Sequence, residues 1–426
     1  MSKSHIAKSK VLLVIIMLLS GEMINPSVSF SVCVVLMILL ILKYRFINRK
    51  EISLITPLLL ILLIGIIGTL LHNRINTVDN IYLVGKDIWY YIKPIIYITT
   101  GFYLFRMKIK QELFFRIFIN LSLLIALVHI FRVGIFVFSA DPESLILDTI
   151  RSKTGPGNIL VAFSLAYLLS SIRSPRVRDL VVMRLWLAIL ILSASLILSF
   201  SRTLLIGLII SFLAFKDLFS FRLNIFLKSV FAACLIFVIG VLGLQLIKKV
   251  SDKDSVIYSL SVKYLNSLNE VTYQDSYETF EKINSNWRGL ETHITQNEIR
   301  KGNLLERIFG FGFGKTVFIG YNGILGKENI FIPKFHNGFI EIILKTGYTG
   351  LIFYLVFFFF AFRTADRRMP GTDADRFLKA LLITALVSTF FITGLYNKSV
   401  FDPVCLSIGY LLGVSLFGKD LFISDS

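Results

Sequence analysis

His336 is the residue best suited to accept a proton in this chain. It lies in the segment Phe335–Glu341 (FHNGFIE), where the polar stretch 250–335 meets the next apolar run, and the chain has only five histidines. Imidazole suits proton transfer near neutral pH, although a lone histidine at such a junction is equally compatible with a structural role. Asn337 is placed to cap the following helix. Glu341, an ionisable group entering an apolar run, is the second candidate catalytic residue.

Three further cations are candidate ligands for phosphate. Arg202 lies in a very short turn between two apolar runs, and its planar fork of donors matches phosphate oxygens, whether of a substrate or of a membrane lipid. Arg151 lies in the loop IRSKTGPGN, whose glycines and proline favour a tight turn that presents backbone N–H groups to an anion; an ordinary loop arginine is the alternative. Lys93 and Asp87 bracket Trp89-Tyr90-Tyr91 at the expected outer end of a span, where Lys93 either binds an anion or extends to the membrane surface.

The long polar stretch carries Arg288 and Glu291, three residues apart on a predicted amphipathic helix at about 276–300. Such a pair typically forms a surface ion pair, and the adjacent Trp287 favours a helix lying on the membrane interface. The segment Phe309–Gly314 (FGFGFG) lacks the spacing and the strand–helix setting of a dinucleotide-binding loop. We expect it to let the polar stretch fold tightly against the bundle.

Composition identifies the class of protein. The chain has 426 residues, of which 55% are apolar and 17% charged, whereas soluble domains are about a quarter charged. The net charge of +18 is spread over short clusters between apolar runs, which favours membrane orientation signals over nucleic-acid binding. The three cysteines all lie in apolar runs without metal-ligand spacing, and no metal or cofactor is expected.

A transmembrane helix needs about 20 mostly apolar residues, and twelve runs in the sequence are apolar enough and come close to this length or exceed it. They are 9–24, 26–42, 52–71, 88–105, 113–131, 157–172, 180–199, 203–219, 224–247, 340–362, 376–395 and 402–418, and the first two are short enough to form a hairpin. The sequence thus predicts an all-α integral membrane protein, a bundle of about twelve transmembrane helices with one large extracytoplasmic loop containing amphipathic helices. Spans one to nine occupy 1–247, the loop 248–339, and spans ten to twelve 340–426.

The basic residues predict the orientation of this bundle. Lysines and arginines of short loops gather on the cytoplasmic side, and here they follow every even-numbered span from the second to the tenth, in 43–50, 106–110, 173–178, 216–222 and 363–376. Both termini are therefore expected in the cytoplasm and the long polar loop outside it.

In this layout the chain resembles the Wzy-type O-antigen and polysaccharide polymerases and the related O-antigen ligases. The resemblance rests on the polytopic architecture with a late extracytoplasmic loop, and on four patches in order. These are Ser199–Thr203 (SFSRT), Trp287–Glu291 (WRGLE), Ile308–Gly314 (IFGFGFG) and Phe335–Gly347 (FHNGFIEIILKTG).

The resemblance implies a reaction at the outer face of a bacterial inner membrane. A glycan on undecaprenyl diphosphate is transferred to an acceptor sugar, and the lipid diphosphate leaves. Family arginines that hold the diphosphate match Arg202 and Arg288 best and Arg151 less well, and the family's loop histidine matches His336. Direct displacement would invert the anomeric centre, but Glu291 and Glu341 leave a retaining double displacement open.

The sequence alone leaves open which molecule accepts the glycan. A polymerase uses a second lipid-linked repeat unit, together with a possible chain-length regulator protein, and a ligase uses lipid A–core. Phe309–Gly314 and Lys345-Thr346-Gly347 favour the polymerase. A lipid-oligosaccharide flippase is the alternative from another class, disfavoured because no pseudo-symmetric halves are evident.

Overall fold

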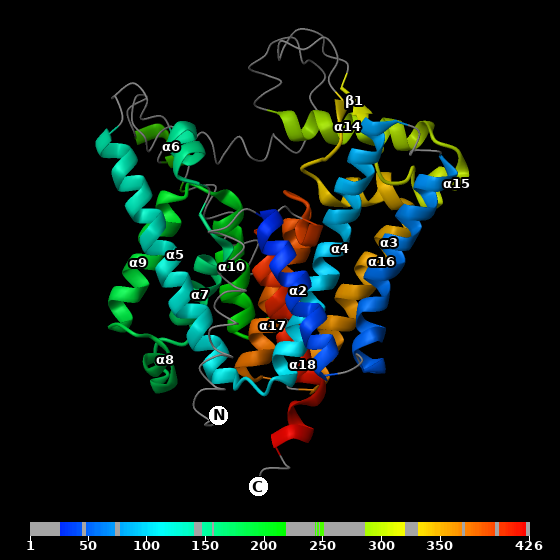
Figure 1. The fold of residues 1–426 in the computed structure, drawn as a ribbon. Coiled ribbons are helices and arrows are strands. Elements are labelled where there is room, and N and C mark those ends of the chain that lie inside the picture. Colours follow the sequence, from blue (N-terminus) through cyan, green and yellow to red (C-terminus); the bar gives the residue numbers. More distant parts are fainter. Residues whose placement is uncertain are drawn as a thin grey trace.

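The protein is a bundle of upright α-helices with shorter helices across one end (Figure 1). This computed structural model describes residues 26–44, 48–72, 77–139, 147–155, 157–218, 243, 245–246, 248–250, 286–319, 331–368, 371–396 and 400–422. The upright helices are α2 (Pro26–Tyr44), α3 (Arg49–Leu71), α4 (Val78–Arg106), α5 (Gln111–Ser139), α7 (Ile159–Ser170), α9 (Leu185–Leu198), α10 (Arg202–Phe215), α16 (Gly338–Arg368), α17 (Asp373–Ser388) and α18 (Asp402–Phe422).

The remaining elements are short. They are the helices α6 (Leu147–Thr154), α8 (Pro175–Leu180), α14 (Trp287–Lys301) and α15 (Leu304–Phe309), the 3-10 turn η3 (Gly394–Tyr396), and the strands β1 (Val317–Phe318) and β2 (Phe331–Ile332). The two strands pair antiparallel, with Val317 opposite Ile332. Both the α14–α15 segment and α6 lie at the end of the bundle opposite the C-terminus (Figure 1).

The helices confirm a membrane protein. Among the described residues, four helices are long and apolar enough to cross a membrane: Ser27–Tyr44, Arg49–Leu71, Gln111–Ser139 and Gly338–Arg367. Shorter apolar helices occupy Ile159–Ser170, Leu185–Leu198, Thr203–Phe215 and Asp402–Phe417. Each predicted span that lies within the described ranges contains a helix, although 181–184 and 389–393 of the spans 180–199 and 376–395 are not helical. The run 9–24 and most of 224–247 lie outside these ranges. The total of twelve spans stays a prediction.

Helix α4 differs from its prediction. It begins at Val78, ten residues before the expected start at 88, so that Asp87 and Lys93 lie inside the helix and not at its end. Both side chains are buried, and each is paired with an opposite charge: Asp87 with Lys345 and Lys93 with Asp402. Because these ion pairs offset the charges, the polar residues do not have to end the helix at the membrane surface.

Helices α4 and α18 pack closely at the centre of the bundle (Figure 1), and glycines at their contact permit the close approach. A Cβ on Gly409 would clash with the backbone of Ile98, and one on Gly101 with the backbone of Leu406. The two backbones therefore touch where the glycines face the partner helix, as small residues permit in membrane bundles. Tyr410 of α18 adds a stack on Phe114 of α5, with ring centroids 4.1 Å apart.

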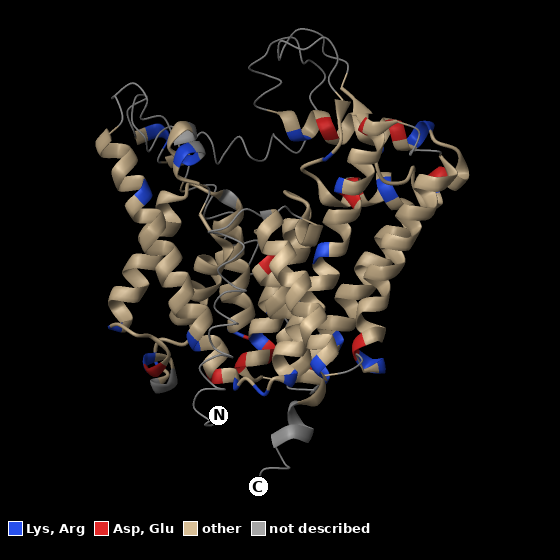
Figure 2. Ribbon diagram, viewed as in Figure 1, with Lys and Arg blue, Asp and Glu red and all other residues tan. Residues whose placement is uncertain are grey.

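Charged residues gather at the two ends of the bundle, and its middle is almost free of them (Figure 2). The loops with predicted cytoplasmic orientation that the structure describes, around 48–50, 106–110, 173–178 and 363–376, lie at the end opposite α14. The arrangement is consistent with the predicted orientation, because the basic loops share one end.

The segment Gly310–Gly314 lies between α3, α4 and α16. Its backbone donates Phe311 N–H to the Leu344 carbonyl (2.8 Å) and Gly312 N–H to the Lys345 carbonyl (3.1 Å). These carbonyls are available because α16 is interrupted at Gly347, whose φ is +69°. Gly314 N–H donates to the Asp87 carboxylate (2.7 Å), which also pairs with Lys345 (2.6 Å). The expectation that this segment folds tightly against the bundle is confirmed.

Replacing Gly312 by Ala tests this packing. Gly312 has φ +81°, and an added Cβ would clash with the backbone of Thr69. The left-handed conformation alone costs an L-residue roughly 1–2 kcal/mol, so Gly312→Ala should lower the apparent melting temperature in detergent and the amount of protein in the membrane. The control is Gly134→Ala, since a Cβ there meets nothing within 4 Å. Equal melting temperatures in the two variants would contradict the packing described.

Candidate active site

A buried glutamate on α14 binds the candidate proton acceptor. Glu291 is 3% exposed, and its Oε2 lies 2.9 Å from Nδ1 of His336. The same oxygen accepts the backbone N–H of His336 (3.2 Å), and Oε1 accepts the indole N–H of Trp287 (2.6 Å). Three donors therefore converge on one carboxylate. The expectation that Glu291 belongs to an exposed surface pair is wrong, because α14 turns this side chain inward.

This contact sets the tautomer of the imidazole. An ionised carboxylate only accepts hydrogen bonds, so Nδ1 of His336 carries the proton that it shares with Glu291. Nε2 is then the nitrogen with a lone pair, and the side chain is 48% exposed. A carboxylate behind the imidazole and an accessible second nitrogen in front of it are the geometry of a general base.

The backbone at His336 is fixed between two helices. Phe335 N–H donates to Glu341 of α16 (3.3 Å), and the next N–H, that of His336, donates to Glu291 of α14. Asn337 accepts Phe339 N–H (3.1 Å) and Ile340 N–H (3.3 Å), so its predicted role as a helix cap is confirmed. The histidine thus lies on a rigid corner and not on an extended loop.

Apolar packing holds α14 over the start of α16. Leu290 and Ile299 on the inner face of α14 are buried with Phe335, Ile340 and Leu344. Thr295, between them, donates its hydroxyl to the Glu291 carbonyl (2.7 Å). The packing that buries Leu290 fixes α14 over the start of α16, and this keeps the Glu291 carboxylate beside His336.

Glu341 has a different setting from the one expected for a catalytic acid. Its side chain is 1% exposed, and its one described contact is with Phe335 N–H. The charged groups that act on it are Lys334, Asp87 and Lys345. Within the described residues Glu341 therefore supports the backbone beside His336, whereas Glu291 contacts the imidazole itself.

The structure brings Arg288 to this site. Arg288 lies in the first turn of α14 and is partly exposed. It precedes Glu291 by three residues, and helical side chains at this spacing are neighbours, with Cβ atoms about 5–6 Å apart. A cation therefore borders the carboxylate–imidazole pair.

Arg151 and Arg202 belong to a second cluster of elements at the same end of the bundle (Figure 1). Arg202 is the first residue of α10, and the structure describes its backbone only. Arg151, in the last turn of α6, is partly exposed. The loop after α6 reaches the turn before α10, since a Cβ on Gly157 would lie 2.6 Å from Ser199 Cβ.

Lys93 lies apart from these groups. It is 1% exposed, and its Nζ is 2.7 Å from the Asp402 carboxylate of α18. Its charge is matched within the bundle, which counts against a role in binding diphosphate, although that prediction itself stays untested.

Two cavities lie at the end of the bundle opposite His336. One, of about 400 Å³, lies between the start of α3 and the ends of α16 and α18, and the other, of about 740 Å³, lies between the ends of α7 and α10 and the start of α17. In the part of the chain that the structure describes, no cluster of three or more His, Cys, Asp or Glu side chains could hold a metal ion. The described residues of the candidate site include the oriented imidazole of His336, the Glu291 carboxylate and, three residues before it on α14, Arg288.

Sequence reasoning missed the role of Glu291 and Trp287. A usable signal was present, because the two residues are four apart and so share one face of a helix. Their pairing with position 336, 45 residues away, has no local signature in the sequence.

A known protein family matches the part of the chain that contains these residues. Residues 187–355 match the O-antigen ligase family, so the resemblance drawn from the sequence is confirmed at the level of the O-antigen ligase-related superfamily. The matched region runs from α9 into α16 and contains Arg202, Arg288, Glu291, His336 and Glu341, whereas Lys93 and Arg151 lie outside it. No curated protein matches the chain.

Glu291→Gln tests the orientation of the imidazole. The amide keeps the size of the side chain but removes the charged acceptor, so we expect the glycan product to fall by about a hundredfold or more, as when an acceptor that orients a catalytic histidine is lost. Product is measured by gel banding of surface polysaccharide and normalised to protein in the membrane. Glu298→Gln is the matched control, since Glu298 lies on the same helix and pairs with Lys315 instead. Equal product in both variants would exclude Glu291 from the mechanism.

Proposed function

We propose that this chain is an O-antigen or polysaccharide polymerase. Its ligase-family region supports an O-antigen ligase- or polymerase-like membrane enzyme with glycosyltransferase-like activity. The proposed reaction transfers a glycan from undecaprenyl diphosphate to a lipid-linked repeat unit and releases undecaprenyl diphosphate. The observation that carries the proposal is the buried Glu291 behind the exposed imidazole of His336.

His336 is the proposed general base. Its Nε2 takes the proton of the acceptor hydroxyl while that oxygen forms a bond to the anomeric carbon of the donor. The positive charge that develops on the imidazole is stabilised by the Glu291 carboxylate, which Trp287 holds in place (2.6 Å). Glu291 thus acts as a positioning residue, since it touches the imidazole and not the sugar.

Arginines are the proposed ligands of the leaving group. As the bond from the anomeric carbon to the diphosphate oxygen breaks, its electron pair passes to the diphosphate, and fixed guanidinium groups stabilise the charge that builds up there. Arg288 is the best supported of these because it borders the His336–Glu291 pair. Arg202 and Arg151 are proposed from the sequence, with support from the contact between their elements. Lys93 is left out because Asp402 matches its charge.

The proposed displacement is direct and inverts the anomeric centre. A retaining route would need a carboxylate nucleophile facing the sugar beside an acid/base carboxyl. Glu291 is occupied by its three donors, and Glu341 is 1% exposed beneath the Phe335–His336 backbone. These placements favour one chemical step, with no covalent glycosyl intermediate.

The proposed location is the bacterial inner membrane, with α14 at its outer face and both termini in the cytoplasm. Support comes from the basic loops, which lie at the end opposite α14 (Figure 2), as the positive-inside rule requires of cytoplasmic loops. In this proposal residues 248–339 form the periplasmic loop between two sets of spans, 1–247 and 340–426.

An O-antigen ligase is the second candidate, and the family that matches residues 187–355 favours it. A deletion strain separates the two functions. Loss of a polymerase leaves single repeat units on the lipid core, whereas loss of a ligase leaves lipid-linked chains unattached. The polymerase proposal fails if the deletion strain accumulates long, unattached chains.

His336→Ala tests the base in that strain. The variant should give no polymerised product although the protein is present at the wild-type level, because the contacts of Glu291 with Trp287 and of Asn337 with α16 do not need the imidazole. His293→Ala is the control, since His293 lies on α14, as Glu291 does, and hydrogen-bonds Asn297 (2.9 Å). Chains of wild-type length from His336→Ala would remove this residue from the mechanism.

Substitutions at Arg288 test the diphosphate ligand. Arg288→Gln should lower product by about ten- to a hundredfold, and Arg288→Lys should restore only part of it, because an ammonium lacks the planar fork. The control is Arg300→Gln, an exposed arginine in the last turn of α14. Full activity of Arg288→Gln with a purified lipid-linked donor would contradict the assignment.

A further inference from the structure

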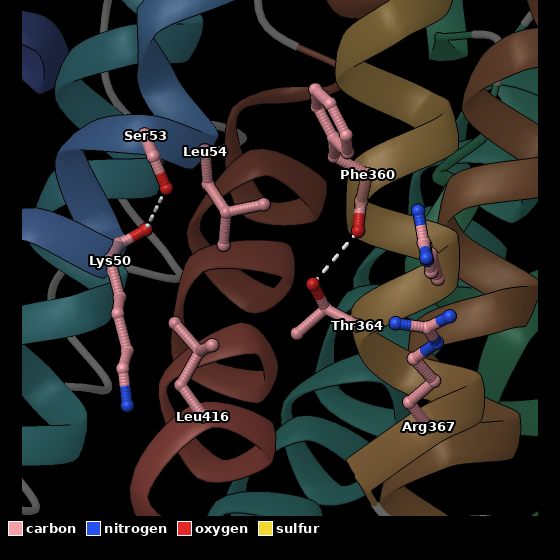
Figure 3. Close-up of a pocket in the computed structure, with 8 residues that line it drawn as sticks. Lys50, Ser53, Leu54, Phe360, Thr364, Arg367 and Leu416 are labelled. Carbon is pink, nitrogen blue, oxygen red and sulfur yellow. Dashed lines mark hydrogen bonds between the residues drawn. The ribbon is translucent and has the colours of Figure 1, made fainter.

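We propose that a basic cleft at the end of the bundle opposite His336 binds the headgroup of an anionic phospholipid. The cleft has a volume of about 400 Å³ and lies between the start of α3 and the ends of α16 and α18. Its lining residues are Lys50, Ser53, Leu54, Phe360, Arg363, Thr364, Arg367 and Leu416. Figure 3 shows Lys50 on one side, Arg367 on the other, and Leu54 and Leu416 between them.

The cleft carries positive charge that the described carboxylates near it do not offset. The two carboxylates next to it in sequence are engaged elsewhere: Glu51 binds Arg106 (2.5 Å), and Asp366 binds Lys379 (2.9 Å). Within the described ranges, neither Lys50, Arg363 nor Arg367 forms an ion pair with an acidic side chain. Three cations around one hollow therefore favour an anion from outside the protein.

The arginines are suited to a phosphate group. Arg363 and Arg367 are four residues apart on α16, so their side chains lie on one face of the helix, and a guanidinium matches phosphate oxygens with two parallel donors. The hydroxyls in the cleft are not available as donors, because Ser53 donates to the Lys50 carbonyl and Thr364 to the Phe360 carbonyl (both 2.8 Å, Figure 3). Lys50, Arg363 and Arg367 therefore supply the binding.

The apolar surroundings indicate that the phosphate belongs to a lipid. Leu54, Phe360 and Leu416 form part of the cleft wall, and both long helices that flank it expose large apolar side chains further along. These are Leu59 and Leu63 on α3, and Leu355 and Phe359 on α16. A headgroup in the cleft would leave its acyl chains beside surfaces of this kind, whereas a soluble anion would not use them. Basic pockets between transmembrane helices bind anionic headgroups in this manner.

Native mass spectrometry of the full chain in detergent tests the site, with phosphatidylglycerol as the anionic probe and phosphatidylcholine as the neutral one. We expect the wild type to retain phosphatidylglycerol in preference. Arg363→Gln/Arg367→Gln should weaken this retention by about thirtyfold, given the typical contribution of each basic residue near a membrane surface. The control Lys110→Gln/Arg116→Gln removes two exposed cations near the start of α5, outside the cleft, and should retain the lipid as the wild type does.

Three outcomes would overturn the proposal: equal retention of the two lipids by the wild type, equal loss in the cleft and control variants, or displacement of phosphatidylglycerol by soluble glycerol 3-phosphate. The melting temperature in phosphatidylcholine shows whether the double variant is folded. If it is not, Arg367→Gln alone should weaken retention by about fivefold. None of these readouts depends on glycan transfer, so the result is independent of the proposed function.

Discussion

The carboxylate of Glu291 is the interaction on which the candidate site depends. A buried charge costs several kcal/mol unless donors compensate it, and here the indole of Trp287, the backbone of His336 and its imidazole do so together. The donors stabilise the carboxylate, and the carboxylate in turn holds the donors in position. Because three donors converge on the carboxylate, it fixes the orientation of the histidine ring and the path of the chain that enters α16. Stability of this corner and orientation of the imidazole therefore have one cause.

The backbone at His336 is attached to the bundle through α16, whose buried Lys345 binds a carboxylate on another helix. Asp87 of α4 accepts both Lys345 Nζ (2.6 Å) and Gly314 N–H (2.7 Å), so one carboxylate joins α4, α16 and the FGFGFG segment. The break in α16 at Gly347 frees the carbonyls of Leu344 and Lys345 for the same segment. At its far end, Glu306 of α15 contacts His72 after α3 (3.2 Å). The described residues 304–314 are thus fixed across the end of the bundle.

The basic side chains at the two ends of the bundle have different surroundings. At the α14 end, Arg288 lies in the first turn of α14, three residues before Glu291, and is partly exposed. At the opposite end, Arg363 and Arg367 line an open cleft while the neighbouring carboxylates bind other partners. Lys93 and Asp402 between the ends form a closed pair. The cations of the two ends are thus exposed to different degrees, whereas the Lys93 charge is matched inside the bundle.

The sequence by itself indicated the membrane class, the approximate positions of most long helices within the described residues and the resemblance to the O-antigen ligase family, because long apolar runs and short ordered patches are local in the chain. It also indicated the helix cap at Asn337, which the structure confirms. The tertiary structure decided the partners: that Glu291 and not Glu341 binds the imidazole, that Asp87 and Lys93 lie inside α4, and that Gly347 interrupts α16. Such pairings join residues tens to hundreds of positions apart. They depend on which faces the packing turns inward, and no local pattern of residue types records that.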